Sequence, residues 1–115
     1  MFVAIYCWRV RPGMEDQFRE GWRRMTETLY RHHGSLGSRL HRNYDGTWFA
    51  YAQWPDRKHW EQAQEAACGS AADALLMMRD SLENPGDLES VAFRLVVTDD
   101  VLQGTAYSVG FEHLP

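Results

Sequence analysis

Long apolar segments and cysteine are both scarce in this sequence. No run of about eighteen apolar residues occurs, which a helix crossing a membrane would require. Cys7 and Cys68 stand far apart and belong to no Cys-x-x-Cys pair, too few for a disulfide scaffold. The chain begins directly with a strand-like pattern and no charged leader. We therefore expect a cytoplasmic protein with reduced thiols and no membrane partner.

Positive charge is not concentrated anywhere along the chain. Twelve Lys and Arg residues are scattered among sixteen Asp and Glu, and the formal net charge is -4. A nucleic-acid-binding face gathers cations on one surface, so no nucleic-acid partner is expected. Hydrophobic residues make up 44% of the 115 residues and are spread throughout, which predicts one folded domain over residues 1–98. The tail, residues 99–115, is too apolar for a free linker, and we expect it to pack on the domain or on a dimer partner.

Apolar periodicity divides residues 1–98 into six successive elements. Strands alternate or are rich in β-branched and aromatic residues, whereas helices repeat apolar residues at steps of three and four. On this basis strands are predicted at residues 2–11, 35–43, 47–54 and 88–98, and helical regions at 14–33 and 55–82, the latter interrupted at Gly69-Ser70. The order β-α-β-β-α-β is typical of an α+β, ferredoxin-like fold with a four-stranded antiparallel sheet and its helices on one face.

The first strand is apolar on both of its faces. Phe2, Ala4, Tyr6 and Trp8 point one way, and residues 3, 5 and 7 are Val, Ile and Cys. An antiparallel sheet facing water alternates apolar with polar residues, so both faces here should be covered. Since the helices cover only one face, we expect a homodimer in which a second sheet covers the other.

Several short segments carry a family resemblance. They are Val10-Arg-Pro-Gly13 with Phe18 and Trp22, Gly34-Ser-Leu-Gly-Ser-Arg-Leu40, Asp45-Gly-Thr-Trp48 and Tyr51-Ala-Gln-Trp-Pro-Asp56. Over roughly residues 2 to 98 the pattern resembles the antibiotic biosynthesis monooxygenase family of dimeric α/β-barrel proteins. The resemblance implies a homodimer whose sheets close into a barrel, with a pocket between sheet and helices in each subunit. Members include cofactor-free oxygenases of polycyclic aromatic phenols, haem-degrading enzymes and many proteins of no known activity.

The haem-degrading branch of this family is the least supported alternative. It uses an Asn on the first strand, with a Trp and an axial His on the second helical region. Here the first strand contains no Asn, and no His occurs between residues 61 and 112, although Trp60 is present. No haem and no other cofactor is therefore expected.

The hairpin at residues 35–54 supplies the candidate active site. If Asp45-Gly46 forms a two-residue turn, Arg39 and His41 share a face with Trp48 and Trp54, and with the small Ala50 and Ala52 between the indoles. The opposite face then carries a plainer apolar set: Leu36, Leu40, Phe49 and Tyr51. A flat ligand fits between two indoles that are separated by alanines.

The resulting hypothesis is a cofactor-independent monooxygenase that acts on a hydroxylated aromatic, polyketide-like substrate. His41 withdraws the substrate proton, Arg39 stabilises the phenolate, and the carbanion reacts with dioxygen directly. Substrate-binding candidates are the side chains that would pack on or hydrogen-bond to the rings: Trp22, Trp48, Trp54, Tyr51 and Tyr6.

Two other interpretations stay open at this stage. Arg39 and His41 can instead lie on a wet rim or in a dimer contact, paired with carboxylates. The whole protein can also be a non-catalytic dimeric module that binds a small apolar ligand. No metal site is expected, because the adjacent His32 and His33 point about a hundred degrees apart on a helix.

Overall fold

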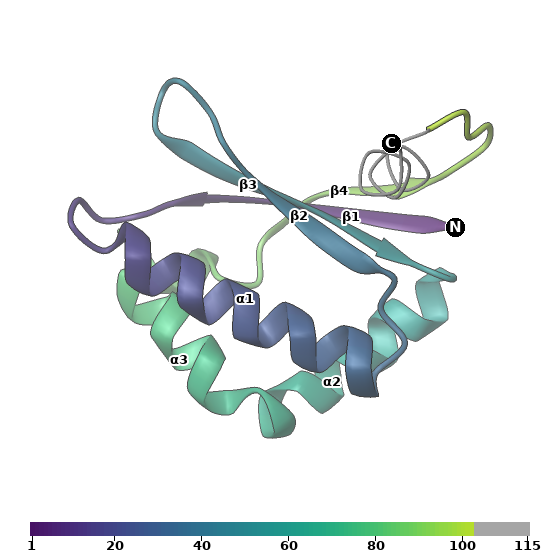
Figure 1. Ribbon diagram of the computed structural model, residues 1–115, viewed down its shortest axis with the longest axis horizontal. Coiled ribbons are helices and arrows are strands. Elements are labelled where there is room, and N and C mark those ends of the chain that lie inside the picture. Colours follow the sequence, from purple (N-terminus) through teal and green to yellow (C-terminus); the bar gives the residue numbers. More distant parts are fainter. Residues whose placement is uncertain (103–115) are drawn as a thin grey trace, which may run out of the picture.

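The computed structural model describes residues 1–102, apart from the side chains of Ala67 and Cys68, and contains one antiparallel sheet with its helices packed on a single face (Figure 1). Its elements in chain order are β1 (Phe2–Arg9), α1 (Glu15–His32), β2 (Gly37–Arg42), β3 (Thr47–Trp54), α2 (Arg57–Ser70), α3 (Ala72–Ser81), the 3-10 turn η1 (Pro85–Asp87) and β4 (Val91–Val96). The strand order is β2-β3-β1-β4. The predicted ferredoxin-like β-α-β-β-α-β fold is confirmed.

Element boundaries differ from the prediction mainly near the last strand. Residues 84–87 form a capped turn in which Asn84 accepts a hydrogen bond from the backbone of Gly86, so β4 begins at Val91 rather than at Leu88. Leu88 is buried, and its carbonyl accepts a hydrogen bond of 3.0 Å from the indole of Trp8. The expected packing of the tail concerns residues that lie, from 103 onward, outside the described part of the chain.

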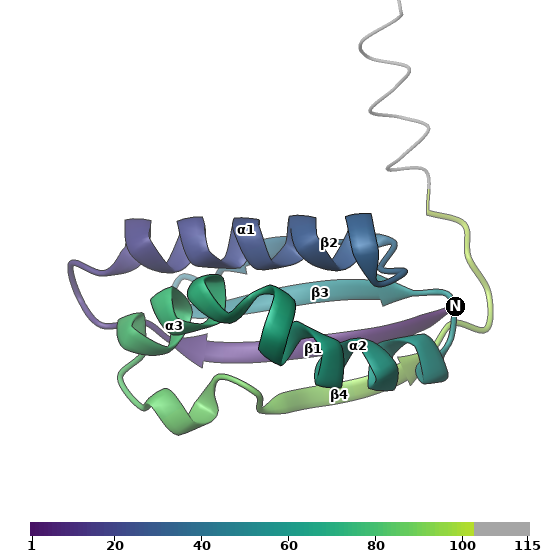
Figure 2. The same cartoon turned by 90° about the horizontal axis from the view of Figure 1, so that it is seen from below.

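Helix α1 buries the stripe that its periodicity predicts. Phe18 and Leu29 point to the sheet, while Glu20, Arg23 and Arg24 form exposed ion pairs on the other side. Gly21 brings α1 against α3, because a β-carbon there would stand 2.9 Å from the carbonyl oxygen of Ala74. The helices therefore form a close layer in front of the sheet (Figure 2).

Two hydrophobic clusters fill the space between this helix layer and the sheet. The first is built around Trp8, Phe18, Trp48, Met78 and Leu82, and the second around Phe2, Leu29, Trp54, Trp60 and Ala63. Tyr6 and Met25 are only partly buried and pack against both clusters. Tyr6 and Met25 therefore lie at the boundary between the two clusters.

The hairpin between β2 and β3 corrects the predicted register. The backbone amide of Asn43 donates to the carbonyl of Thr47 at 2.8 Å, which leaves three loop residues, with Gly46 at a φ of +90°. Arg39 therefore pairs with Tyr51, and His41 with Phe49. Because side chains alternate along a strand, one extra loop residue moves every side chain of one strand to the other face.

The sheet face away from the helices is rich in apolar side chains. Phe93 and Leu95 of β4, which pair with Ile5 and Val3, are 57% and 43% exposed. On β1, Val3 is already buried within the chain, whereas Ile5 and Cys7 are half-buried. No helix of residues 1–102 lies over this outer sheet face (Figure 1). Within residues 1–102, no helix has the length and apolarity needed to cross a membrane.

Candidate functional site

A cavity of about 110 Å³ lies between the sheet and the helices, at the boundary of the two clusters. Its walls come from β1, β2, β3 and all three helices. The lining residues are mainly aromatic or aliphatic: Tyr6, Trp8, Trp22, Met25, Leu29, Ala50, Ala52, Trp54, Leu75, Met78 and Leu88, with the polar Thr26, Ser35, Ser38, Gln64 and Glu89 among them. An apolar cavity with a few polar groups is the usual form of a small-ligand site.

Tyr6 places the central polar group in this cavity. Its ring stacks on Trp8, and its hydroxyl accepts a hydrogen bond of 3.0 Å from the indole Nε1 of Trp60. Burial raises the pKa of the Tyr6 hydroxyl above its ordinary value, although hydrogen bonds with Trp60 and Gln64 oppose the rise. Tyr6 is therefore a neutral phenol at physiological pH, a hydrogen-bond donor rather than a base.

Charged groups lie around the Tyr6 end of the cavity. The guanidinium of Arg94 lies 5.5 Å from the ring centre of Trp60, and both Arg94 and Glu89 act electrostatically on Tyr6. Glu89 lines the cavity from the loop before β4 and forms an exposed pair with Arg79 at 3.4 Å. An exposed pair of this kind contributes little to stability, so Glu89 is free to serve another partner.

The β2 side of the cavity carries a second set of polar atoms. The hydroxyl of Ser35 accepts a hydrogen bond of 2.9 Å from the amide of Gly37. In contrast, the hydroxyl oxygen of Ser38 and the indole nitrogen of Trp54 are buried and have no hydrogen-bond partner. Buried polar atoms are nearly always paired, so these two require a physical explanation.

The structure divides the predicted site residues between the two faces of the sheet. Tyr6, Trp22 and Trp54 line the cavity, as do Ala50 and Ala52. Trp48 is on the same face but lies in the core beside Phe18, with Arg42 over its ring.

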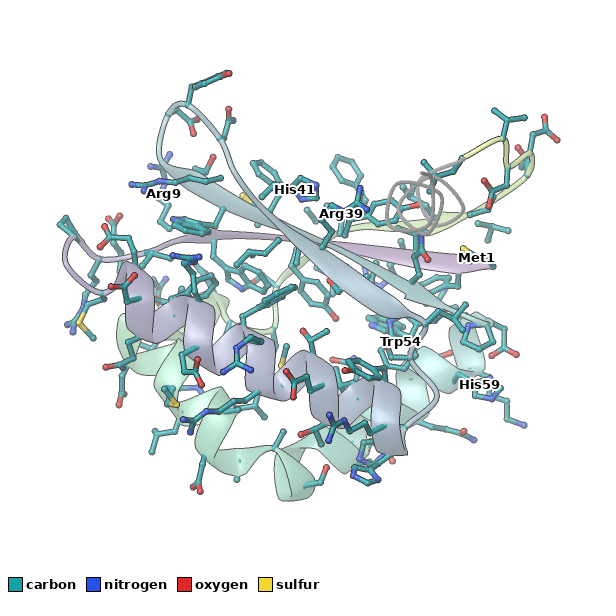
Figure 3. All side chains as sticks on the ribbon, in the orientation of Figure 1. Met1, Arg9, Arg39, His41, Trp54 and His59 are labelled. Carbon is teal, nitrogen blue, oxygen red and sulfur yellow. The ribbon has the colours of Figure 1, made fainter. Side chains whose placement is uncertain are left out.

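Arg39, His41 and Tyr51 lie on the outer sheet face, and none of them lines this cavity. Figure 3 shows Arg39 and His41 on the side of the sheet opposite Trp54 and the helices. The predicted shared surface of Arg39, His41, Trp48 and Trp54 is therefore wrong, because it assumed a two-residue turn. Whether Arg39 or His41 affects turnover stays a prediction.

The polar residues of the cavity were missed by the sequence analysis. Only the three-residue loop places Ser38, rather than Arg39, on the cavity face of β2. Gln64 and Glu89 lie in segments without a clear alternating pattern. One signal was available for the loop. A three-residue hairpin loop that ends in a Gly in the left-handed region is among the next most common hairpin connections after two-residue loops.

The ionisable residues of the described chain, residues 1–102, were compared with the needs of a metal or haem site. Residues 1–102 contain no group of three His, Cys, Asp or Glu side chains arranged to hold a metal ion. His59 of α2 hydrogen-bonds to Asp56 at 2.8 Å, the residue that caps this helix, and does not line the cavity. The residues therefore do not fit the haem-binding arrangement of the family's haem branch.

Known structures share this fold at low sequence identity. Rv0793 from Mycobacterium tuberculosis aligns with a TM-score of 0.65 and 16% identity, over 88% of this chain and 98% of its own. SnoaB, a cofactor-independent oxygenase from Streptomyces nogalater, aligns with a TM-score of 0.66 and 14% identity, over 87% and 95%. A structure described as an antibiotic biosynthesis monooxygenase aligns with a TM-score of 0.57 and 16% identity, over 89% and 99%. No curated protein matches the sequence significantly.

The fold is that of a ferredoxin-like domain with an apolar cavity between sheet and helices. The sequence model of the family described as antibiotic biosynthesis monooxygenase matches residues 1–68, more than half of the chain. This protein belongs to that family.

Proposed function

We propose that the protein is a cofactor-independent monooxygenase acting on a small hydroxylated aromatic substrate. The observation that carries this proposal is the aromatic-walled cavity, which holds one neutral, buried phenol donor, Tyr6, and one carboxylate, Glu89. SnoaB, a cofactor-independent oxygenase with the same fold, supports the same reaction class. The cavity volume of about 110 Å³ favours one ring inside it, because a cavity of about 150 Å³ accommodates a single benzene. Further rings of a substrate would extend toward the open side of the cavity.

The reaction needs little from the protein beyond proton transfer and exclusion of water. A substrate methylene activated by an adjacent phenol system loses a proton, and the carbanion passes one electron to dioxygen. Recombination forms a C–O bond, and loss of water from the hydroperoxide leaves a carbonyl, so that CH₂ plus O₂ gives C=O plus H₂O. The apolar walls strengthen the electrostatic interactions that guide these steps.

Two cavity residues are assigned to these steps. Tyr6 donates a hydrogen bond from its hydroxyl to the substrate oxygen on which negative charge accumulates, while Trp60 and Gln64 hold this hydroxyl in position. Glu89 accepts the substrate proton, because it is the one carboxylate among the described lining residues. Burial of Tyr6 and the accessible position of Glu89 suit these opposite roles.

Substitution of these residues tests the proposal. We expect Glu89→Gln to lower oxygen consumption with an anthrone substrate about a hundredfold, and Tyr6→Phe at least tenfold, in the ranges found for a general base and an oxyanion donor. An oxygen electrode gives both rates, and Tyr44→Phe at the fully exposed hairpin tip is the matched control.

Substitution of His41 and Arg39, on the outer sheet face, tests the alternative location of the base. If His41→Ala or Arg39→Ala abolishes oxygen consumption while Glu89→Gln does not, the base lies on the other face of the sheet and the present assignment is overturned. If wild-type protein binds aromatic ligands without any oxygen consumption, the protein is a binding module, the second candidate that the enclosed apolar cavity supports.

We further propose a homodimer formed through the outer sheet face. Exposed Phe93 and Leu95 continue the half-buried Ile5 and Cys7 across two paired strands, an apolar surface that a second sheet would bury. Light scattering should give twice the chain mass of 13.4 kDa.

Substitution should then separate the dimer. Phe93→Glu is expected to give a folded monomer, whereas Leu76→Glu on exposed α3 should leave the mass unchanged. A wild-type monomer at all accessible concentrations would contradict the dimer.

A further inference from the structure

We propose that Ser38 and Trp54 form a binding site for a carbonyl oxygen of the ligand, on the side of the cavity away from Tyr6. Ser38 and Trp54 both line the cavity, and Ser38 Oγ and Trp54 Nε1 are buried behind its surface and have no hydrogen-bond partner. This inference rests on the proposed function of the cavity. It specifies the substrate further, as an aromatic ketone that also carries the reactive hydroxylated ring.

Ser38 Oγ and Trp54 Nε1 both require a hydrogen-bond acceptor on the ligand. An indole N–H can only donate a hydrogen bond, and a serine hydroxyl donates when no other acceptor is near. A carbonyl oxygen has two lone pairs and accepts both bonds. A buried donor without a hydrogen-bond partner costs about 1–3 kcal/mol of stability. A ligand that supplies the acceptor removes this cost, and its binding free energy becomes more favourable.

The sheet register places this pair near one end of the cavity. Ser38 pairs with Ala52 of β3, and Trp54 follows two residues later on the same face. Trp54 is 1% exposed and belongs to the cluster of Leu29 and Trp60, so its indole is held firmly in place. Its nitrogen is therefore a fixed donor without a partner in the chain.

Tyr6 defines the other polar end. It pairs with Ala50 on the neighbouring strand, two residues along β3 from the partner of Ser38. Strand spacing and rise then separate the α-carbons of Tyr6 and Ser38 by about 12 Å. The alanines between them, Ala50 and Ala52, leave the floor flat. A fused ring system with oxygen atoms on opposite edges matches this arrangement.

Ser35 provides a matched control in the same cavity. It lines the cavity beside Ser38, but its hydroxyl already accepts the amide hydrogen of Gly37. Ser35→Ala therefore breaks an existing hydrogen bond, whereas Ser38→Ala removes an atom that has none. The two substitutions are chemically identical and should act oppositely on the empty protein.

The test compares two bicyclic probes that differ in one carbonyl, 1-tetralone and tetralin, by isothermal titration calorimetry. We expect wild-type protein to bind 1-tetralone about tenfold more tightly than tetralin. Ser38→Ala and Trp54→Phe should abolish this preference while the affinity for tetralin changes less than threefold. The melting temperature of ligand-free Ser38→Ala should equal or exceed that of wild type, and that of Ser35→Ala should fall.

Each contrary result has a defined meaning. Equal binding of both probes by wild-type protein, no binding of either, or an equal loss for both probes in Ser38→Ala overturns the carbonyl site. A lowered melting temperature in ligand-free Ser38→Ala would also overturn it, because the hydroxyl would then have a structural partner. None of these results requires turnover, so failure of the monooxygenase proposal appears separately, as absent oxygen consumption with an intact carbonyl preference.

Discussion

Phe18→Ala should remove about 4 kcal/mol of folding free energy, the largest stability loss expected from a single substitution here. Phe18 is 0% exposed and meets Trp8 and Trp48 edge-on, at ring distances of 5.3 and 5.7 Å. Truncation of a buried Phe to Ala costs about 3–5 kcal/mol, to which lost aromatic contacts contribute. Because small domains have only about 5–15 kcal/mol of stability, this variant should lose a quarter or more of its free energy of unfolding.

Urea denaturation followed by tryptophan fluorescence gives the comparison directly. Tyr30→Ala is the matched control, since Tyr30 is on the same helix and is 47% exposed. Its free energy of unfolding should change by less than about 0.5 kcal/mol. Similar losses in the two variants would mean that α1 does not bury Phe18 between the two indoles.

Ala52→Leu should weaken binding of aromatic ligands by at least tenfold without unfolding the protein. The alanine lies on the floor of the cavity, between Ser38 on β2 and Ala4 on β1. Three added carbon atoms occupy space that a ligand ring would need, within a volume of only about 110 Å³. Filling an internal cavity commonly stabilises a protein, so the melting temperature should stay equal or rise.

The control for Ala52→Leu makes the same chemical change outside the cavity. Ala72 is exposed at the start of α3, so Ala72→Leu should leave ligand affinity within twofold of wild type. Calorimetric titration with 1-tetralone and with tetralin measures both variants. An Ala52→Leu variant that keeps full affinity for both probes would place the ligand elsewhere, for example against the outer sheet face.

The fold was readable from the sequence because its signals are local and repeated. The stripe of Phe18 and Leu29 fixes α1, and the break at Gly69-Ser70 is where α2 ends and a new helix begins. The order of elements then leaves few topologies, of which the ferredoxin-like one is the common solution. Family membership follows from the same distributed landmarks.

The candidate site was less predictable, because the residues that line it depend on whether the β2–β3 loop has two residues or three. Both loop lengths are compatible with Tyr44-Asp45-Gly46, but they place opposite faces of β2 against the cavity. Arg39 and His41 stand out in the sequence as reactive side chains, whereas Ser38, which directly precedes Arg39, carries no chemical signal there. Tyr6, Trp60 and Glu89 come from β1, α2 and the loop before β4, and they interact only in the folded protein. A local sequence pattern cannot predict such contacts between distant segments.

The distribution of indoles has a practical consequence for spectroscopy. Three of the five tryptophans, at positions 8, 22 and 54, line the cavity, and Trp60 hydrogen-bonds to the hydroxyl of Tyr6 that enters it. A quinone or ketone within van der Waals distance quenches indole emission, whereas a ligand on the outer sheet face would lie on the far side of the strands. The protein therefore carries its own optical reporter of occupancy, which needs no label and distinguishes the two faces of its sheet.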